Sequence, residues 1–145
     1  MRRFVVPWHR KIAEVVHAAG RPTVMHSCGC LDAVMDDIVN VIRHDGKHSY
    51  EDAIRPVEQA YEQMVGRIAV IGGLDVDFVC RSQPAEVFER AQAMLERVAG
   101  RGGYALGTGN SVPEYVPQEN YFAMLAAAWA HRPGYRLPKK AGAKT

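Results

Sequence analysis

The run RIAVIGG, residues 67–73, has the composition of a buried strand, and two further runs follow it: PAEVFERAQAMLERV at 84–98 and GGYALGTG at 102–109. The middle run repeats its apolar residues at helical spacing, whereas the outer two are short and β-prone. Gly100 stands where a left-handed residue commonly ends a helix. Strand, helix and strand in this order predict two parallel strands, because parallel neighbours need a connection of about a helix in length.

The same unit recurs toward the N-terminus. RPTVMHS at 21–27 and RHDGKHS at 43–49 are two more β-prone runs, and each precedes a helical pattern. Residues 4–20 form a helical pattern with no strand before it, and residues 117–131 form the last one. The order α(βα)4 predicts an α/β fold built on a four-stranded parallel sheet.

Local signals mark where the helices begin and end. Gly20 and Gly66 stand at helix ends as Gly100 does. Ser49, three residues before Asp52, predicts a helix start. In the first crossover, residues 34–42, helical spacing places four apolar residues on one face: Val34, Ile38, Val41 and Ile42.

Two architectures fit this order of elements. One is a self-contained doubly wound sheet, and the other is half of a (β/α)8 barrel, since a whole barrel needs about 250 residues. Both place their chemistry at the carboxyl ends of the strands. The residues best suited to chemistry follow the four strands in turn: His26 and Cys28, His48 and Glu51, Asp75 and Asp77, and Thr108 and Asn110.

Length, charge and cysteine content restrict the class of protein. The 145 residues suit one domain, which we expect at 1–132, followed by a disordered basic tail at 133–145. A net charge of +2, with bases and acids interleaved along the helices, argues against nucleic-acid binding. No apolar run approaches the roughly 20 residues of a membrane span. Three cysteines and no export signal predict a cytoplasmic protein with reduced thiols.

Four ordered blocks then resemble a known family. They are HSCG after the first strand, KHSYEDAIRPVEQAYEQ after the second, IAVIGGLDVDFVCRSQPAEV around the third, and GGYALGTGNSVPEYVPQENYFAML at the end. Together, over residues 4–130, they resemble the C-terminal half of the uroporphyrinogen decarboxylase superfamily, nearest to its corrinoid-dependent methyltransferase branch. The resemblance implies strands five to eight of a TIM barrel, a choice that periodicity alone does not make.

The methyltransferase branch is similar to this chain in having His-x-Cys after the fifth strand, which implies that His26 and Cys28 bind zinc. Residues i and i+2 of a strand share a face, so an imidazole and a thiolate can converge on one ion. By the same resemblance, zinc holds a substrate thiol that accepts a methyl group from a corrinoid on a partner protein. The alternative is a buried strand end that binds no metal, since free cysteine is commonly buried.

The third zinc ligand departs from the family pattern. Where the methyltransferases have Gly-Cys-Gly and the decarboxylases tend to have histidine, this chain has Gly107-Thr108-Gly109. A replacement ligand would have to come from one of several sources: Cys30, Cys80, Glu51 or the other half of the barrel.

Further residues are candidates for substrate contact or catalysis. His48 and Glu51 are catalytic or substrate-contact candidates, or else they only belong to a polar cluster in which Ser49 and Asp52 cap a helix. Asp75 matches an aspartate of the family's loop after the third strand and is the remaining catalytic candidate, the alternative being a residue that only shapes the loop. The turn Gly107, Thr108, Gly109 and Asn110 is a candidate anion or substrate site, although tight-turn geometry explains its glycines equally well.

Two other functions remain open. One is a decarboxylase of porphyrin biosynthesis, whose many-carboxylate substrate needs arginines, and here Arg55 and Arg81 are the ones near the strand ends. The other is an inactive fragment, or one chain of a split or dimeric barrel. Four strands cut from a barrel leave two unpaired edges, so we expect either a homodimer or a complementary N-terminal half-barrel as partner.

Overall fold

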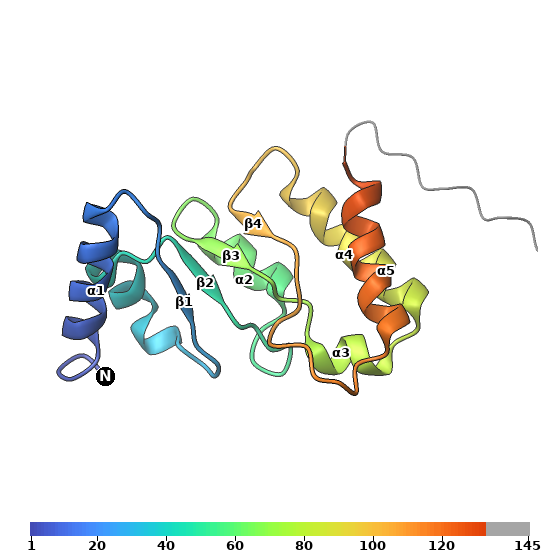
Figure 1. Cartoon of the computed structure of the whole chain (residues 1–145), viewed down its shortest axis with the longest axis horizontal. Coiled ribbons are helices and arrows are strands. Elements are labelled where there is room, and N and C mark those ends of the chain that lie inside the picture. The colour runs from blue at the N-terminus through green and yellow to red at the C-terminus, as the bar shows by residue number, and fades with distance from the viewer. Residues whose placement is uncertain (133–145) are drawn as a thin grey trace, which may run out of the picture.

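The computed structural model describes residues 1–132, in which helices alternate with short strands (Figure 1). The basic tail predicted at 133–145 lies outside the described residues. The elements are α1 (Val6–Ala18), β1 (Val24–His26), the 3-10 helix η1 (Asp32–Val34), the π-helix η2 (Asp37–Ile42), β2 (Gly46–His48), α2 (Val57–Met64), β3 (Ala69–Ile71), α3 (Val76–Arg81), α4 (Pro84–Val98), β4 (Tyr104–Ala105) and α5 (Gln118–Ala130).

The strands form one parallel sheet in the order β1-β2-β3-β4, so the predicted four-stranded α/β fold is confirmed. Each strand lies inside one of the four β-prone runs. The register sets His26 beside His48 and Met25 beside Lys47. Because side chains alternate along a strand, the histidine pair and Lys47 lie on opposite faces of the sheet.

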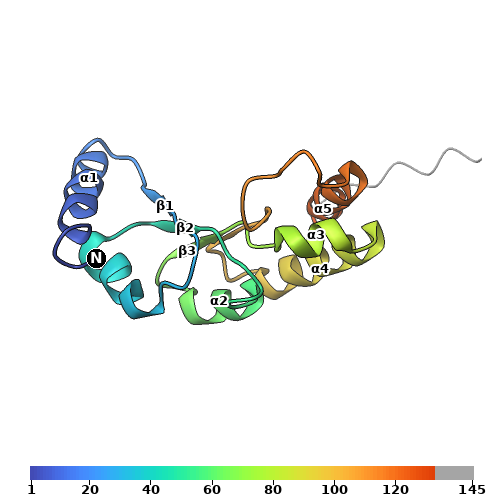
Figure 2. The same ribbon diagram turned by 90° about the horizontal axis from the view of Figure 1, so that it is seen from below.

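Helices cover one face of this sheet. Figure 2 shows them in an arc, from α1 at one end, past α2, to α5 at the other, and no helix of residues 1–132 lies over the opposite face. The covered face carries Met25 and Val70 into a core with Ile38, Val57 and Tyr61, all of them buried. An arc of helices around one face of a parallel sheet is half of a (β/α)8 barrel.

The helix ends follow the predicted glycines, but two local predictions were wrong. Gly20, Gly66 and Gly100 all have φ near +70°, as left-handed helix ends require. Ser49 caps no helix: α2 begins at Val57 after Pro56, and Ser49 itself has φ +84°. The amphipathic helix expected at 34–42 is split into η1 and η2, and its wider π-turn leaves Val41 exposed while Ile38 and Ile42 are buried.

The uncovered face and both ends of the arc expose apolar side chains. Val24, on the uncovered face of β1, is 52% exposed. Trp8, Ile12 and Val15 form an exposed stripe on α1, and Phe122 is 60% exposed on α5. Within residues 1–132, no helix has the length and apolar content needed to cross a membrane.

Candidate active site

A chain of polar contacts joins the carboxyl ends of β1, β2 and β4 on the uncovered face. The parallel register brings the rings of His26 and His48 together, with 2.7 Å between their Nδ1 atoms. On the far side of His26, its Nε2 lies 3.7 Å from Cys28 Sγ. On the far side of His48, its Nε2 lies 3.1 Å from the carbonyl oxygen of Thr108. Three predicted site segments are therefore in direct contact.

The carbonyl of Thr108 determines which ring nitrogen of His48 and of His26 carries a proton. A carbonyl oxygen only accepts hydrogen bonds, so His48 donates from Nε2. In the neutral ring, His48 Nδ1 then carries a lone pair and accepts the Nδ1 proton of His26. His26 Nε2 is left as a lone pair that faces the Cys28 thiol. Thr108 and His48 thus orient His26 and hold its tautomer, as hydrogen-bond partners of metal-binding histidines commonly do.

The distance between His26 Nε2 and Cys28 Sγ suits a shared metal ion. Tetrahedral zinc with ordinary Zn–N and Zn–S bonds sets these two ligand atoms about 3.6 Å apart. The observed separation is 3.7 Å, and the histidine lone pair lies on the side of the thiol. These two residues therefore fit zinc. Within residues 1–132, however, no group of three His, Cys, Asp or Glu side chains has the arrangement of a metal site.

Two further donors surround the Cys28 sulfur. Ser49 Oγ and Asn110 Nδ2 each donate to Cys28 Sγ over 3.3 Å. Sequence reasoning predicted Ser49 as a helix cap and missed it as a site residue. The feature that identifies it is its backbone conformation, because a non-glycine residue at φ +84° next to a site residue is a strained position of the kind found at functional sites.

The turn Gly107–Asn110 contacts the cluster mainly through its backbone. Gly72 allows this approach, because a Cβ there would overlap the Thr108 carbonyl oxygen and lie 2.8 Å from the His48 ring. Gly109 donates its N–H to Leu74 and accepts from the Tyr50 N–H, so its amide is already engaged. The glycines are thus needed for close packing, and substrate binding by the turn stays a prediction.

The remaining candidates lie farther from the sulfur. Glu51 accepts the Gly29 N–H over 3.4 Å, which places it beside the loop that follows Cys28. Asp75 accepts backbone N–H groups of Asp52, Asp77 and Phe78, and so caps α3 and joins two loops. A catalytic role for either residue stays a prediction.

The other two cysteines have different surroundings. Cys30 is exposed on the loop after β1, two residues beyond Cys28. Cys80 lies on α3, half-buried against a core cluster that includes Val79 and Val87. The structure therefore brings neither of them into the contacts of His26 and Cys28 described above.

Parallel β/α units in an arc, with their polar side chains gathered at the carboxyl ends of the strands, define the barrel class of enzyme folds. Comparison with known proteins narrows this class. The family model for uroporphyrinogen decarboxylase (URO-D) matches residues 1–131, and the chain belongs to this family.

A solved structure, described as a methyltransferase from Methanosarcina mazei, has the same fold with a TM-score of 0.66 and 24% sequence identity. The match covers 87% of this chain and 35% of that one, so this chain spans about a third of the length of its structural relative. No curated protein matches the chain.

Proposed function

We propose that the chain is the thiol-activating half of a methyltransferase-like enzyme of the uroporphyrinogen decarboxylase family. The observation that carries the proposal is the His26 lone pair, held by His48 and directed at Cys28 from 3.7 Å. A solved methyltransferase with the same fold is in accord with it. The reaction class is transfer of a methyl group from a corrinoid, carried by a partner protein, to a substrate thiol.

Each residue of the cluster has a separate task in this proposal. His26 and Cys28 hold zinc, with at least one further ligand from the substrate thiol or from the other half of the barrel. When bound, zinc supplies the positive charge that keeps a substrate thiol deprotonated near neutral pH. His48 keeps the Nδ1 proton on His26, and thereby keeps Nε2 free as a ligand.

Ser49 and Asn110 complete the surroundings of the sulfur. Their hydrogen bonds lower the charge density on the Cys28 thiolate and fix its direction. Asn110 belongs to the turn predicted to bind substrate. A movement of that turn would therefore change the hydrogen bond that Asn110 donates to the Cys28 sulfur. Glu51, beside the loop after Cys28, is the nearest predicted acid or base for proton exchange with the substrate.

The arginines favour this reaction over decarboxylation of a substrate with many carboxylates. Such a substrate requires guanidinium groups free to face it. Arg55 instead makes two hydrogen bonds to Asp32, at 2.9 and 2.6 Å, and Arg81 is paired with Asp77 at 2.6 Å. Both candidate arginines are therefore already neutralised within the chain.

We further infer that four more strands complete the sheet, from a second copy or from an N-terminal half-barrel. β1 and β4 are edge strands whose outer backbone groups have no partner strand within residues 1–132. Val24 on the uncovered face, and the α1 stripe of Trp8, Ile12 and Val15, are apolar surfaces of the kind that barrel closure buries. Sedimentation should detect a dimer or complex, and a cooperatively folded monomer would contradict closure.

We also place the protein in the cytoplasm, where its free cysteines would stay reduced. A reducing compartment suits a function that depends on the Cys28 thiolate. Fusion to a fluorescent reporter and cell fractionation would test this placement directly.

Metal content tests the proposed site. The reduced protein, purified without added zinc, should hold about one zinc per chain, and Cys28→Ala should lose most of it. Cys80→Ala is the matched control, since Cys80 is packed on α3 and should not affect zinc. Equal zinc in wild type and Cys28→Ala by elemental analysis would contradict the assignment.

A further inference from the structure

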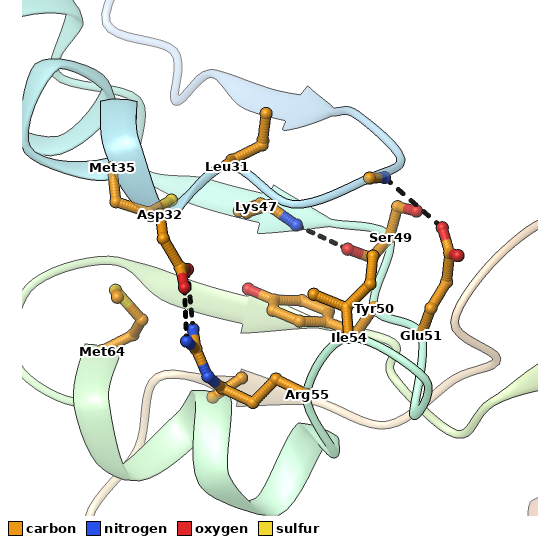
Figure 3. A pocket seen from close by; sticks show the side chains of 12 residues that line it. Leu31, Asp32, Met35, Lys47, Ser49, Tyr50, Glu51, Ile54, Arg55 and Met64 are labelled. Atoms are coloured by element: carbon orange, nitrogen blue, oxygen red, sulfur yellow. Dashed lines mark hydrogen bonds and ion pairs between the residues drawn. The ribbon is translucent and has the colours of Figure 1, made fainter.

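A cavity lies on the helix-covered face of the sheet, away from the contacts around Cys28. Figure 3 shows it between β2, the segment that leads into η1, and the start of α2. Its volume is about 50 Å³, enough for a few waters or one small organic molecule. Much of its wall is apolar: Leu31, Met35, Ile54, Ala60 and Met64.

Lys47 is the unusual member of this wall. Its side chain projects from the middle of β2 into the layer between sheet and helices and is only 6% exposed. Its Nζ donates to the Ser49 carbonyl oxygen over 2.5 Å and lies 4.1 Å from the centre of the Tyr50 ring. An ammonium has three donors, and among the ion pairs found within residues 1–132 none joins a carboxylate to this one.

Burial lowers the pKa of Lys47, and the nearby Cys28 and Glu51 offset this effect only in part. The charged form of Lys47 is therefore costly at this buried position. A buried charge of this kind is normally compensated by an opposite charge and further hydrogen bonds.

Tyr50 contributes a second donor to the same cavity. Its hydroxyl is buried and has no hydrogen-bond partner among residues 1–132. Burial raises the pKa of Tyr50, so the hydroxyl keeps its proton and acts as a donor. In Figure 3 the ring crosses the cavity below Lys47, with its hydroxyl directed toward the side of Asp32 and Arg55. Buried polar atoms are rarely left unsatisfied, so this hydroxyl points to a missing acceptor.

The carboxylates of the wall do not supply that acceptor. Asp32, also in the wall, is held by Arg55 through two hydrogen bonds. Glu51 accepts the Gly29 N–H instead. Lys47 and Tyr50 thus form a pair of donors in an apolar cavity without a carboxylate of their own.

We propose that this cavity binds a small carboxylate with a short alkyl chain, which accepts hydrogen bonds from Lys47 Nζ and Tyr50 Oη. The alkyl chain packs against Met35 and Met64. The occupant supplies the negative charge that Lys47 lacks and the acceptor that Tyr50 lacks. The site is separate from the zinc site, because Lys47 and His48 project to opposite faces of β2.

Propionate is the probe, and the methyl groups of Met35 and Met64 are the reporters. In protein labelled with ¹³C at the methionine methyl groups, propionate should shift both signals saturably, with millimolar affinity for so small a ligand. The methyl signal of Met124, buried in a separate core cluster with Leu74 and Val79, should stay in place. Propionamide, which has the same shape without the charge, should shift none of them.

Variants locate the binding. Lys47→Leu should abolish the shifts, and Tyr50→Phe, which removes one hydrogen bond, should weaken binding about tenfold. Cys80→Ala, outside both the cavity wall and the zinc site, should bind propionate as wild type does. Zinc content is measured separately, so failure of the zinc site leaves this prediction intact. Absence of saturable shifts in the wild type up to about 100 mM would overturn the proposal. Equal binding of propionamide, or binding lost in Cys80→Ala but kept in Lys47→Leu, would overturn it as well.

Discussion

Gly72→Ala tests whether the third strand meets the histidine cluster as closely as the structure shows. Gly72 has φ +75°, where an alanine costs about 1–2 kcal/mol in backbone strain. The added Cβ would also overlap the backbone oxygen of Thr108 and lie 2.8 Å from the His48 ring. Pushing two packed segments apart costs about a further 1–3 kcal/mol. We therefore expect the free energy of unfolding to fall by about 2–5 kcal/mol in total.

Gly66→Ala is the matched control for the backbone contribution. Gly66 has φ +77°, and a Cβ there would meet no atom within 4 Å. It should cost only the strain of about 1–2 kcal/mol, measured by urea unfolding with unchanged m-values. The excess loss in Gly72→Ala is then the cost of the close approach. A loss in Gly72→Ala no larger than that in Gly66→Ala would refute the packing of His48 against Thr108.

Two further predictions concern buried polar groups. Tyr61→Phe removes a 2.7 Å hydrogen bond to the Gly102 carbonyl and should cost about 1–2 kcal/mol of stability. Tyr104→Phe removes a buried hydroxyl without a partner in residues 1–132 and should be neutral or stabilising. Thermal unfolding measures both variants, and a larger loss in Tyr104→Phe than in Tyr61→Phe would contradict the hydrogen-bond assignment. Burial, followed by the charge of His9, lowers the pKa of His44. Below about pH 6.5 the unfolded chain therefore binds a proton at His44 that the native state resists. The free energy of unfolding should fall as the pH decreases through that range. His44→Gln should lose less stability than wild type between about pH 7.5 and pH 5.5, and identical losses would show that His44 does not contribute.

The sequence carried enough information for the order of elements, because strand runs and helix-ending glycines are local signals. Gly20, Gly66 and Gly100 each adopt the left-handed conformation expected of them. Barrel closure is not a local property, and periodicity fitted a doubly wound sheet as well. Only the resemblance to a family favoured the half barrel over the doubly wound sheet. Val41 was misplaced because a π-helix changes the angle between successive side chains, and no residue type announces one.

The site was predictable as a set of residues but not as a set of contacts. His26, Cys28 and His48 stand after strands, where barrel chemistry lies. That His26 faces His48 depends on the register of β1 against β2, and three-residue strands do not encode a register. Lys47 was overlooked because a lysine between a glycine and a histidine gives no sign that its side chain is buried.

X-ray absorption at the zinc edge tests the central claim most directly, because it counts the atoms bound to the metal. For the reduced wild-type protein we expect nitrogen at about 2.0–2.1 Å from His26 and sulfur at about 2.3 Å from Cys28. The sulfur shell should disappear in Cys28→Ala and persist in Cys80→Ala. A wild-type spectrum without sulfur, or a sulfur shell unchanged in Cys28→Ala, would contradict a zinc site at His26 and Cys28.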